Sequence, residues 1–352
     1  MRLVRLAAVI LLPTTVCLAA PMAGMAGPSE QAPPQAATPQ QPTTPARGAQ
    51  GGQGGRGGTP RVIHIPDAPV LDYVAVANAL PLPAGMTYGI VASVAVNSKG
   101  HVFVYHRMAV PLVEFDENGR FVRGMREGTA TRAHSVRVDA ADNLWLVDSG
   151  DHTVVKLSPQ GDVLMTLGTK GVVGTGDAAA ARQQFNIPSD VAIAPNGDVF
   201  IAQGEAGGPD PRVIRFDRSG TFITTWSLAF KEGTRSNPHA IEVDRDGLIY
   251  VADREVMRIR VFRADGTPVR DIQMENPVCG LFIDKDQQLW IATGADGQMM
   301  KIDRDGKVLG FAGRKGTGVG EMGEAHMLAV APSGDVYVAD STGHKIEKFA
   351  KR

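Results

Sequence analysis

The sequence is short of cysteine and of any excess charge, and both shortages exclude classes of protein. Only Cys17 and Cys279 occur among the 352 residues. If the N-terminus is removed, a single thiol remains and no internal disulfide can form, so packing must stabilise the fold. The 36 basic side chains are balanced by 37 acidic ones. Binding to nucleic acid depends on a surplus of Lys and Arg, so we expect no nucleic-acid partner.

Long helices and long hydrophobic runs are also scarce. The 41 Gly and 23 Pro make the chain too rich in turns for a helical bundle. The main apolar run, residues 6–20, follows two arginines and is interrupted by Pro13. Because it is too short to span a bilayer comfortably, residues 1–26 are predicted to be a signal peptide. We expect a secreted or periplasmic protein with no membrane span after cleavage, tethered to a membrane only if this segment is retained or Cys17 is lipidated.

Residues 27–60 lack large apolar side chains and consist mainly of Pro, Gln, Ala, Thr and Gly. Such a segment cannot bury enough surface to offset the entropy of ordering, and it is predicted to be a disordered linker. A phosphate-binding glycine loop would need a strand before it and a helix after it, and neither is indicated. The folded domain is therefore expected to be residues 61–352.

One pattern recurs six times in this domain: an alternating strand, a polar turn and a second strand that usually ends in Asp. The repeats occupy residues 93–105, 134–148, 189–203, 239–253, 279–293 and 326–340. Their central turn residues lie 41 to 54 positions apart. Four-stranded units of this length cannot hide both faces alone, and six of them arranged radially form an all-β, six-bladed β-propeller with a central channel. A β-sandwich would not explain the fixed period.

Histidine recurs at one position of alternate repeats. The residues four places before the last apolar residue of each first strand are Ala92, His134, Ser189, His239, Cys279 and His326. Repeats two, four and six lie about 120° apart in a six-fold ring, and first strands line the channel. Three imidazoles that converge with one position free are typical of a catalytic zinc site. The alternatives are core histidines with satisfied ring nitrogens and, for Cys279, either a further soft ligand or a small buried hydrophobic residue.

Two other pairs of residues share a position. His152 and His344 each follow a second strand. The expected role of each is either a polar residue of the turn or a contact with a metal-ligating side chain rather than with the metal itself. Arg107 and Arg254 come directly after second strands. An arginine there is either a clamp for a substrate carboxylate or, by default, the partner of an aspartate on a neighbouring blade.

Several phrases of the sequence resemble a known family. Ala-His-Ser-Val at 133–136, Pro-His-Ala-Ile at 238–241, Val-Ala-Asp-Arg-Glu at 251–255 and Phe-Val-Tyr-His-Arg at 103–107 resemble NHL repeats. More narrowly, the chain is similar over about residues 90–350 to the peptidyl-α-hydroxyglycine α-amidating lyase (peptidylamidoglycolate lyase) family.

The resemblance implies a zinc ion held by His134, His239 and His326, with Arg107 holding the substrate carboxylate. The family's reaction splits a peptidyl-α-hydroxyglycine into a peptide amide and glyoxylate. In that family zinc acts as a Lewis acid on the hydroxyl, and a tyrosine is assigned as base.

The sequence departs from the family at two places. The tyrosine is missing, and residues 203–205 are Gln-Gly-Glu, so that Glu205 is either a replacement base or a solvated loop acid. Residues 324–327 are Glu-Ala-His-Met, without the aspartate that the family associates with a structural calcium ion. Calcium is therefore doubtful, and the family's disulfides are absent too.

Taken together, the sequence predicts an exported, monomeric zinc propeller of the amidating-lyase type. Its substrate would be a small molecule or peptide with a carboxylate, and its activity the family's lyase reaction or a related cleavage of a carbon–nitrogen or carbon–oxygen bond. The alternative is a non-catalytic NHL propeller that binds a protein or glycan. A calcium-dependent lactonase is disfavoured, because calcium prefers oxygen ligands to imidazole.

Overall fold

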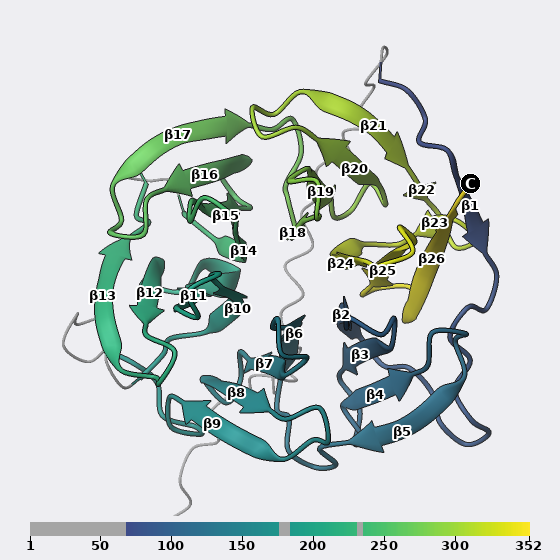
Figure 1. The fold of residues 1–352 in the computed structure, drawn as a ribbon, viewed down its shortest axis with the longest axis horizontal. Coiled ribbons are helices and arrows are strands. Elements are labelled where there is room, and N and C mark those ends of the chain that lie inside the picture. Colours follow the sequence, from purple (N-terminus) through teal and green to yellow (C-terminus); the bar gives the residue numbers. More distant parts are fainter. Residues whose placement is uncertain (1–67, 176–183, 231–234) are drawn as a thin grey trace, which may run out of the picture. The chain divides into compact units, whose positions relative to one another are not determined.

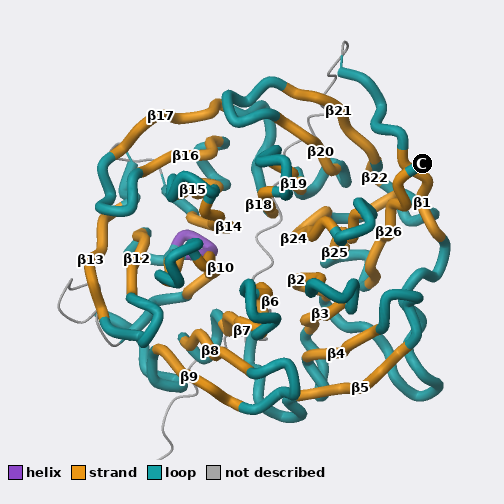
Figure 2. Tube along the Cα trace, viewed as in Figure 1, coloured by secondary structure: helices purple, strands orange, loops and turns teal. Residues whose placement is uncertain are grey.

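Strands make up nearly all of the regular structure in the computed structural model, which describes residues 68–175, 184–230 and 235–352. Within those ranges the helical structure is the short 3-10 turn η2 (Glu205–Gly207), drawn purple in Figure 2. No helix in the described ranges is long and apolar enough to cross a bilayer. The predicted signal peptide and linker lie outside the described residues and stay predictions.

The six repeats form six four-stranded antiparallel blades around a central axis (Figure 1), which confirms the predicted β-propeller. Within blades one to five the strands follow sequence order from the axis outward. Blades one to three are β2 (Val91–Val96), β3 (Val102–His106), β4 (Leu112–Phe115) and β5 (Phe121–Met125); β6 (Ala133–Val138), β7 (Leu144–Asp148), β8 (Thr153–Leu157) and β9 (Val163–Leu167); and β10 (Pro188–Ile193), β11 (Val199–Gln203), β12 (Arg212–Phe216) and β13 (Phe222–Ser227). Blades four and five are β14 (Pro238–Val243), β15 (Ile249–Asp253), β16 (Arg258–Phe262) and β17 (Pro268–Gln273); and β18 (Gly280–Ile283), β19 (Leu289–Ala292), β20 (Met299–Ile302) and β21 (Val308–Ala312).

The sixth blade joins the two ends of the domain. It consists of β24 (Ala325–Val330), β25 (Val336–Asp340) and β26 (Lys345–Lys351), and its outer strand is β1 (Tyr73–Val76), which precedes the first repeat. Tyr73 pairs with Lys351 in the antiparallel ladder. A short parallel ladder of β22 (Arg314–Lys315) and β23 (Glu321–Met322) lies in the connection before β24. The pairing of β1 with β26 thus joins the beginning of the domain to its end and closes the ring.

The packing between blades is apolar and the inner strands are buried. For example, Val147, Val191 and Phe216 belong to one buried cluster that joins blades two and three. Residues 133–137 of β6 are all buried although the segment contains a histidine, a serine and an arginine. Polar side chains on these strands must therefore find partners inside the channel.

A β-bulge interrupts the inner ladder at the histidine position. Ala133 pairs with Asp148 and Ser135 with Val147, which leaves His134 without a ladder partner. The same irregularity leaves out His239 on β14 and Ser189 on β10. A bulge bends the strand and redirects one residue, and such bulges are common beside functional sites. Here they free a side chain or a carbonyl for contacts across the channel.

Candidate metal centre

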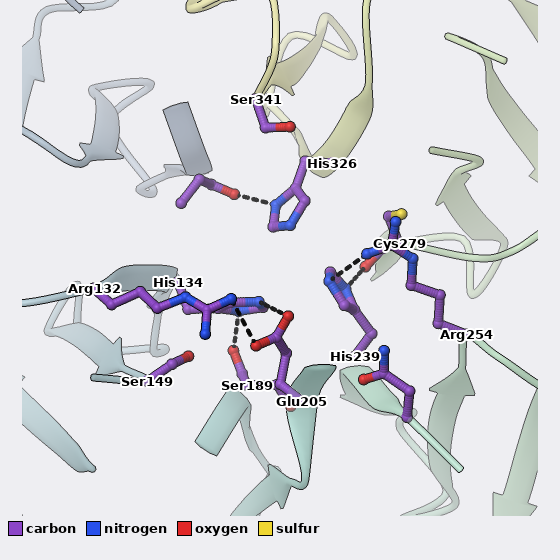
Figure 3. A network of polar contacts seen from close by, with 12 residues as sticks. Arg132, His134, Ser149, Ser189, Glu205, His239, Arg254, Cys279, His326 and Ser341 are labelled. Atoms are coloured by element: carbon purple, nitrogen blue, oxygen red, sulfur yellow. Dashed lines mark hydrogen bonds and ion pairs between the residues drawn. The ribbon is translucent and has the colours of Figure 1, made fainter. Parts of the chain in front are cut away.

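The three histidines predicted from the repeat meet in the channel. His134, His239 and His326 come from β6, β14 and β24, and all three are buried. Their candidate ligand nitrogens lie within 4.8 Å of one another, and the ring centroids are 4.8 to 5.3 Å apart. Figure 3 shows the three rings facing one another.

Each ring is oriented by a backbone carbonyl of the next blade. The Nδ1 atoms lie 2.6 Å from the carbonyl oxygens of Ser189, Cys279 and Ala92 respectively. These carbonyls belong to the other three members of the predicted column, so histidines alternate with the residues that accept their hydrogen bonds. Because a carbonyl only accepts, Nδ1 must donate, and in a neutral ring Nε2 then carries a lone pair.

Burial keeps the three rings neutral. Burial lowers the pKa of His326 to about 4 and holds the pKa values of His134 and His239 well below the ordinary range. The Nε2 atom of His134 is buried without a hydrogen-bond partner among the described residues. A buried acceptor of this kind is costly unless a ligand satisfies it. Three neutral imidazoles with fixed Nδ1 partners fit a zinc ion bound by three protein ligands, with one position free.

The other residues considered as ligands stay outside this group. Cys279 is buried, and burial raises the pKa of its thiol to about 12. Its carbonyl oxygen, rather than its sulfur, accepts the hydrogen bond from Nδ1 of His239. His152 and His344 adopt positive φ angles of 58° and 54° in the turns after β7 and β25. Nδ1 of His152 accepts the amide of Ile187 at 3.0 Å. Their position favours the polar-turn interpretation.

The two arginines of the shared position have different surroundings. Arg254 forms an ion pair with Glu324 at 3.0 Å, and its Nη1 lies 3.4 Å from Nε2 of His239. Arg107 donates from Nε to the carbonyl of Ala133 at 3.1 Å and has no carboxylate within 4.0 Å among the described residues. Burial and the nearby charge of Arg132 lower the pKa of Arg107. The sequence analysis expected each arginine, by default, to pair with an aspartate on a neighbouring blade. Arg254 has an acidic partner, although it is the glutamate Glu324, whereas Arg107 has no carboxylate within 4.0 Å among the described residues.

Glu205 lies beside the histidines, and its interpretation as a solvated loop acid is wrong. Only 6% of the residue is exposed. Its Oε1 is 3.9 Å from Nε2 of His134, and its Oε2 is 3.1 Å from an Nη atom of Arg132. The preceding Gly204 has a φ of 99°, and a Cβ there would lie 2.7 Å from the Pro211 backbone. The turn that directs Glu205 inward therefore requires glycine.

Arg132 and Glu324 were not identified from the sequence as site residues. Arg132 stands two places before His134, and Glu324 stands two places before His326. Both lie just outside the inner strands, next to the bulges that break the alternation, so the strand period could not show where their side chains point. The second oxygen of Glu324 accepts a hydrogen bond from Ser341 at 2.6 Å. Both of its oxygens are thus engaged, one by Arg254 and one by Ser341.

A second polar layer centres on Arg137, three residues after His134 on β6. Arg137, on β6, donates to Asp190 at 2.9 Å and to Glu242 at 2.8 Å. It also donates to the carbonyl of Leu281 at 3.0 Å. The layer links blades two to five, and nothing in the sequence analysis anticipated it.

Comparisons with known proteins identify an NHL repeat and relatives named as amidating lyases. The NHL repeat model matches residues 236–262, which cover β14 to β16. A probable peptidyl-alpha-hydroxyglycine alpha-amidating lyase, pgal-1 of Caenorhabditis elegans, is 28% identical over 294 residues, 71% of this chain and 79% of the relative. NHL repeat-containing protein 3 of Homo sapiens is 32% identical over 165 residues, 44% of this chain and 45% of the relative.

Among solved structures, a streptogramin B lyase aligns with a TM-score of 0.57 at 15% identity, over 80% of this chain and 98% of that one. At this identity the likeness shows the fold alone. The repeat match, the sequence relatives and the six blades lead to one conclusion. The chain is a six-bladed NHL-repeat propeller homologous to the peptidyl-α-hydroxyglycine α-amidating lyases.

Proposed function

We propose that the protein is an exported, monomeric, zinc-dependent lyase that cleaves α-hydroxyglycine-type substrates bearing a carboxylate. The observation that carries the proposal is the shared orientation of the three histidines. Each Nδ1 is bound to a carbonyl, which leaves Nε2 of each ring as the candidate metal ligand, and the candidate ligand atoms lie within 4.8 Å of one another. The homology to amidating lyases supports the reaction class.

In this proposal His134, His239 and His326 hold the zinc ion. The ion would supply Lewis acidity, drawing electrons from the substrate hydroxyl and easing loss of its proton. Arg107 binds the substrate carboxylate, because its guanidinium is near the imidazole of His134 and has no acidic partner within 4.0 Å among the described residues. A planar guanidinium matches a carboxylate through two parallel hydrogen bonds.

Glu205 is proposed as the base. It takes the hydroxyl proton, the carbonyl of glyoxylate forms, and the bond between that carbon and the amide nitrogen breaks. The nitrogen takes a proton in return from Glu205, so the reaction releases a primary amide and glyoxylate without net proton change. Glu324 is less suited to this role because Arg254 and Ser341 bind both of its oxygens.

The experiment is incubation of the zinc-loaded protein with an α-hydroxyglycine-terminated peptide while glyoxylate is measured. We expect turnover, and we expect Arg107→Ala to lower kcat/KM roughly 100-fold, since a lost partner of a charged pair typically costs about 2 to 5 kcal/mol. Arg107→Lys should recover part of the loss. Absence of turnover in fully zinc-loaded protein would contradict the lyase proposal, and failure to bind zinc at all would favour the non-catalytic binding module.

A further inference from the structure

Two carboxylates lie at the metal centre, and their surroundings differ. Glu324 is held at both oxygens by neutral or positive donors. Glu205 is held only at one side: Arg132 approaches Oε2 at 3.1 Å, while Oε1 faces Nε2 of His134 at 3.9 Å. The contact with Arg132 is an ion pair rather than a hydrogen bond, because Oε2 has no hydrogen-bond partner among the described residues. Figure 3 shows the carboxylate of Glu205 beside both Arg132 and His134, with a dashed line to each.

The main chain of Arg132 is held by a hydrogen bond to the side chain of Asp148. The carboxylate of Asp148, at the end of β7, accepts the amides of Thr131 and Arg132 at 2.7 and 2.9 Å. The same carboxylate accepts the amides of Gly150 and Asp151 across the turn, each at 2.9 Å. These hydrogen bonds fix the backbone of Arg132 at the end of blade two, so that only its side chain can change position.

Other cations compete for Glu205. Arg107 and Arg254 both experience the charge of Glu205. A buried carboxylate seeks the nearest guanidinium, because an unpaired charge inside a protein is unfavourable. Without Arg132, Glu205 would turn toward Arg107 or Arg254 and leave its place beside His134. If Glu205 turned toward Arg107, it would also occupy the guanidinium that the proposed function assigns to the substrate carboxylate.

We propose that Arg132 is a positioning residue that holds Glu205 against the open side of the histidine site and keeps it off Arg107. This inference rests on the proposed function for its kinetic consequence. Its structural consequence, the place of the Glu205 side chain, does not depend on activity or on bound metal.

The kinetic experiment is a double-mutant cycle of Arg132→Ala and Glu205→Gln in the zinc-loaded protein. Arg132→Ala should lower kcat roughly 10- to 100-fold, the usual effect of losing a residue that orients a reacting group. The double variant should be no slower than Glu205→Gln alone, because the two residues act as a unit. Arg132→Lys, which keeps the charge, should recover part of kcat. Independent, multiplicative losses, or a raised KM with unchanged kcat, would overturn the proposal and make Arg132 a substrate contact.

The second readout is a crystal structure of Arg132→Ala beside that of the unaltered protein. We expect Glu205 to have turned toward Arg107 or Arg254. If its Oε1 remained about 4 Å from Nε2 of His134, as it is now, the proposal would be wrong. If the unaltered protein showed no lyase activity, the proposed function would fail while this measurement still decided the role of Arg132.

The matched control is Arg258→Ala. Arg258 forms an ion pair with Asp271 at 2.9 Å, and its side chain is 34% exposed against 39% for Arg132. It links β16 to β17, outside the site. Its removal deletes the same chemical group from a similar pair, so kcat and the place of Glu205 should not change. Thermal unfolding of each variant separates a lost fold from a lost contact.

Discussion

Two polar layers on the inner strands, one around the histidines and one around Arg137, satisfy their buried polar groups in opposite ways. In the histidine layer each Nδ1 is bound, while the Nε2 atoms face one another and that of His134 has no partner among the described residues. In the Arg137 layer the guanidinium bonds to Asp190, Glu242 and the carbonyl of Leu281.

The difference teaches how a ligand site is distinguished from a structural network. Buried polar groups are nearly always satisfied by the protein itself, as they are around Arg137. The histidine layer fixes every Nδ1 and still leaves the buried Nε2 of His134 without a partner among the described residues, so a bound cation would complete it. The three predictions below test this contrast.

The largest expected effect is on zinc content. His239→Ala should lower bound zinc from about one ion per chain to nearly none after dialysis, because only two of the three imidazoles remain. Elemental analysis of the purified protein measures it. His152→Ala removes a histidine from a turn outside the group of three histidines, and this variant should retain its full zinc content. Equal zinc in all three proteins would place the metal elsewhere.

Removal of the central cation of the other layer should destabilise the fold and spare the metal. Arg137→Met leaves the buried Asp190 and Glu242 unpaired, and breaking a buried pair typically costs about 3 to 5 kcal/mol. Urea unfolding gives the loss in free energy, and zinc content should be unchanged. Arg137→Met combined with Asp190→Asn should recover part of the stability. A variant that kept its stability and lost its zinc would reverse the assignment of the two layers.

The smallest expected effect is a pH dependence in the Arg137 layer. Burial raises the pKa of Glu242 to about 7 from an ordinary value near 4.5, and the negative charge of Asp190 adds to the rise while Arg137 opposes it. A raised pKa in the folded state means that the stabilising contribution is complete below about pH 4.5 and is lost as the pH rises through 7.

The free energy of unfolding of the unaltered protein should therefore fall relative to that of Glu242→Gln between pH 4.5 and about 7, by about 3 kcal/mol, since one pKa unit corresponds to about 1.4 kcal/mol. Urea unfolding at a series of pH values measures this difference. Parallel pH profiles for the two proteins would show that Glu242 does not titrate in this range.

The fold was accessible from the sequence because its period is strict and its strands alternate. The six repeats predicted the inner two strands of every blade, and the column that contains His134, His239 and His326 predicted which side chains meet. Both inferences need only local pattern and six-fold symmetry.

Features set by irregular backbone were not accessible. The outer strand β1 carries only four residues and joins the sixth blade from the other end of the domain. The burial of Glu205 follows from a tight turn at Gly204 and from Arg132 on another blade. Two of the carbonyl partners of the histidines, Ser189 and Ala92, lie at bulges, which a repeat pattern does not reveal.

The central claim is that three imidazoles from alternate blades bind one metal ion through Nε2. The most direct test is a crystal structure of the zinc-loaded protein with anomalous scattering recorded at the zinc edge. The account predicts a single strong peak about 2.0 to 2.1 Å from Nε2 of each of the three histidines, with Nδ1 still bound to the carbonyls. A zinc peak at another place, or Nε2 atoms with no peak between them in zinc-saturated crystals, would contradict it.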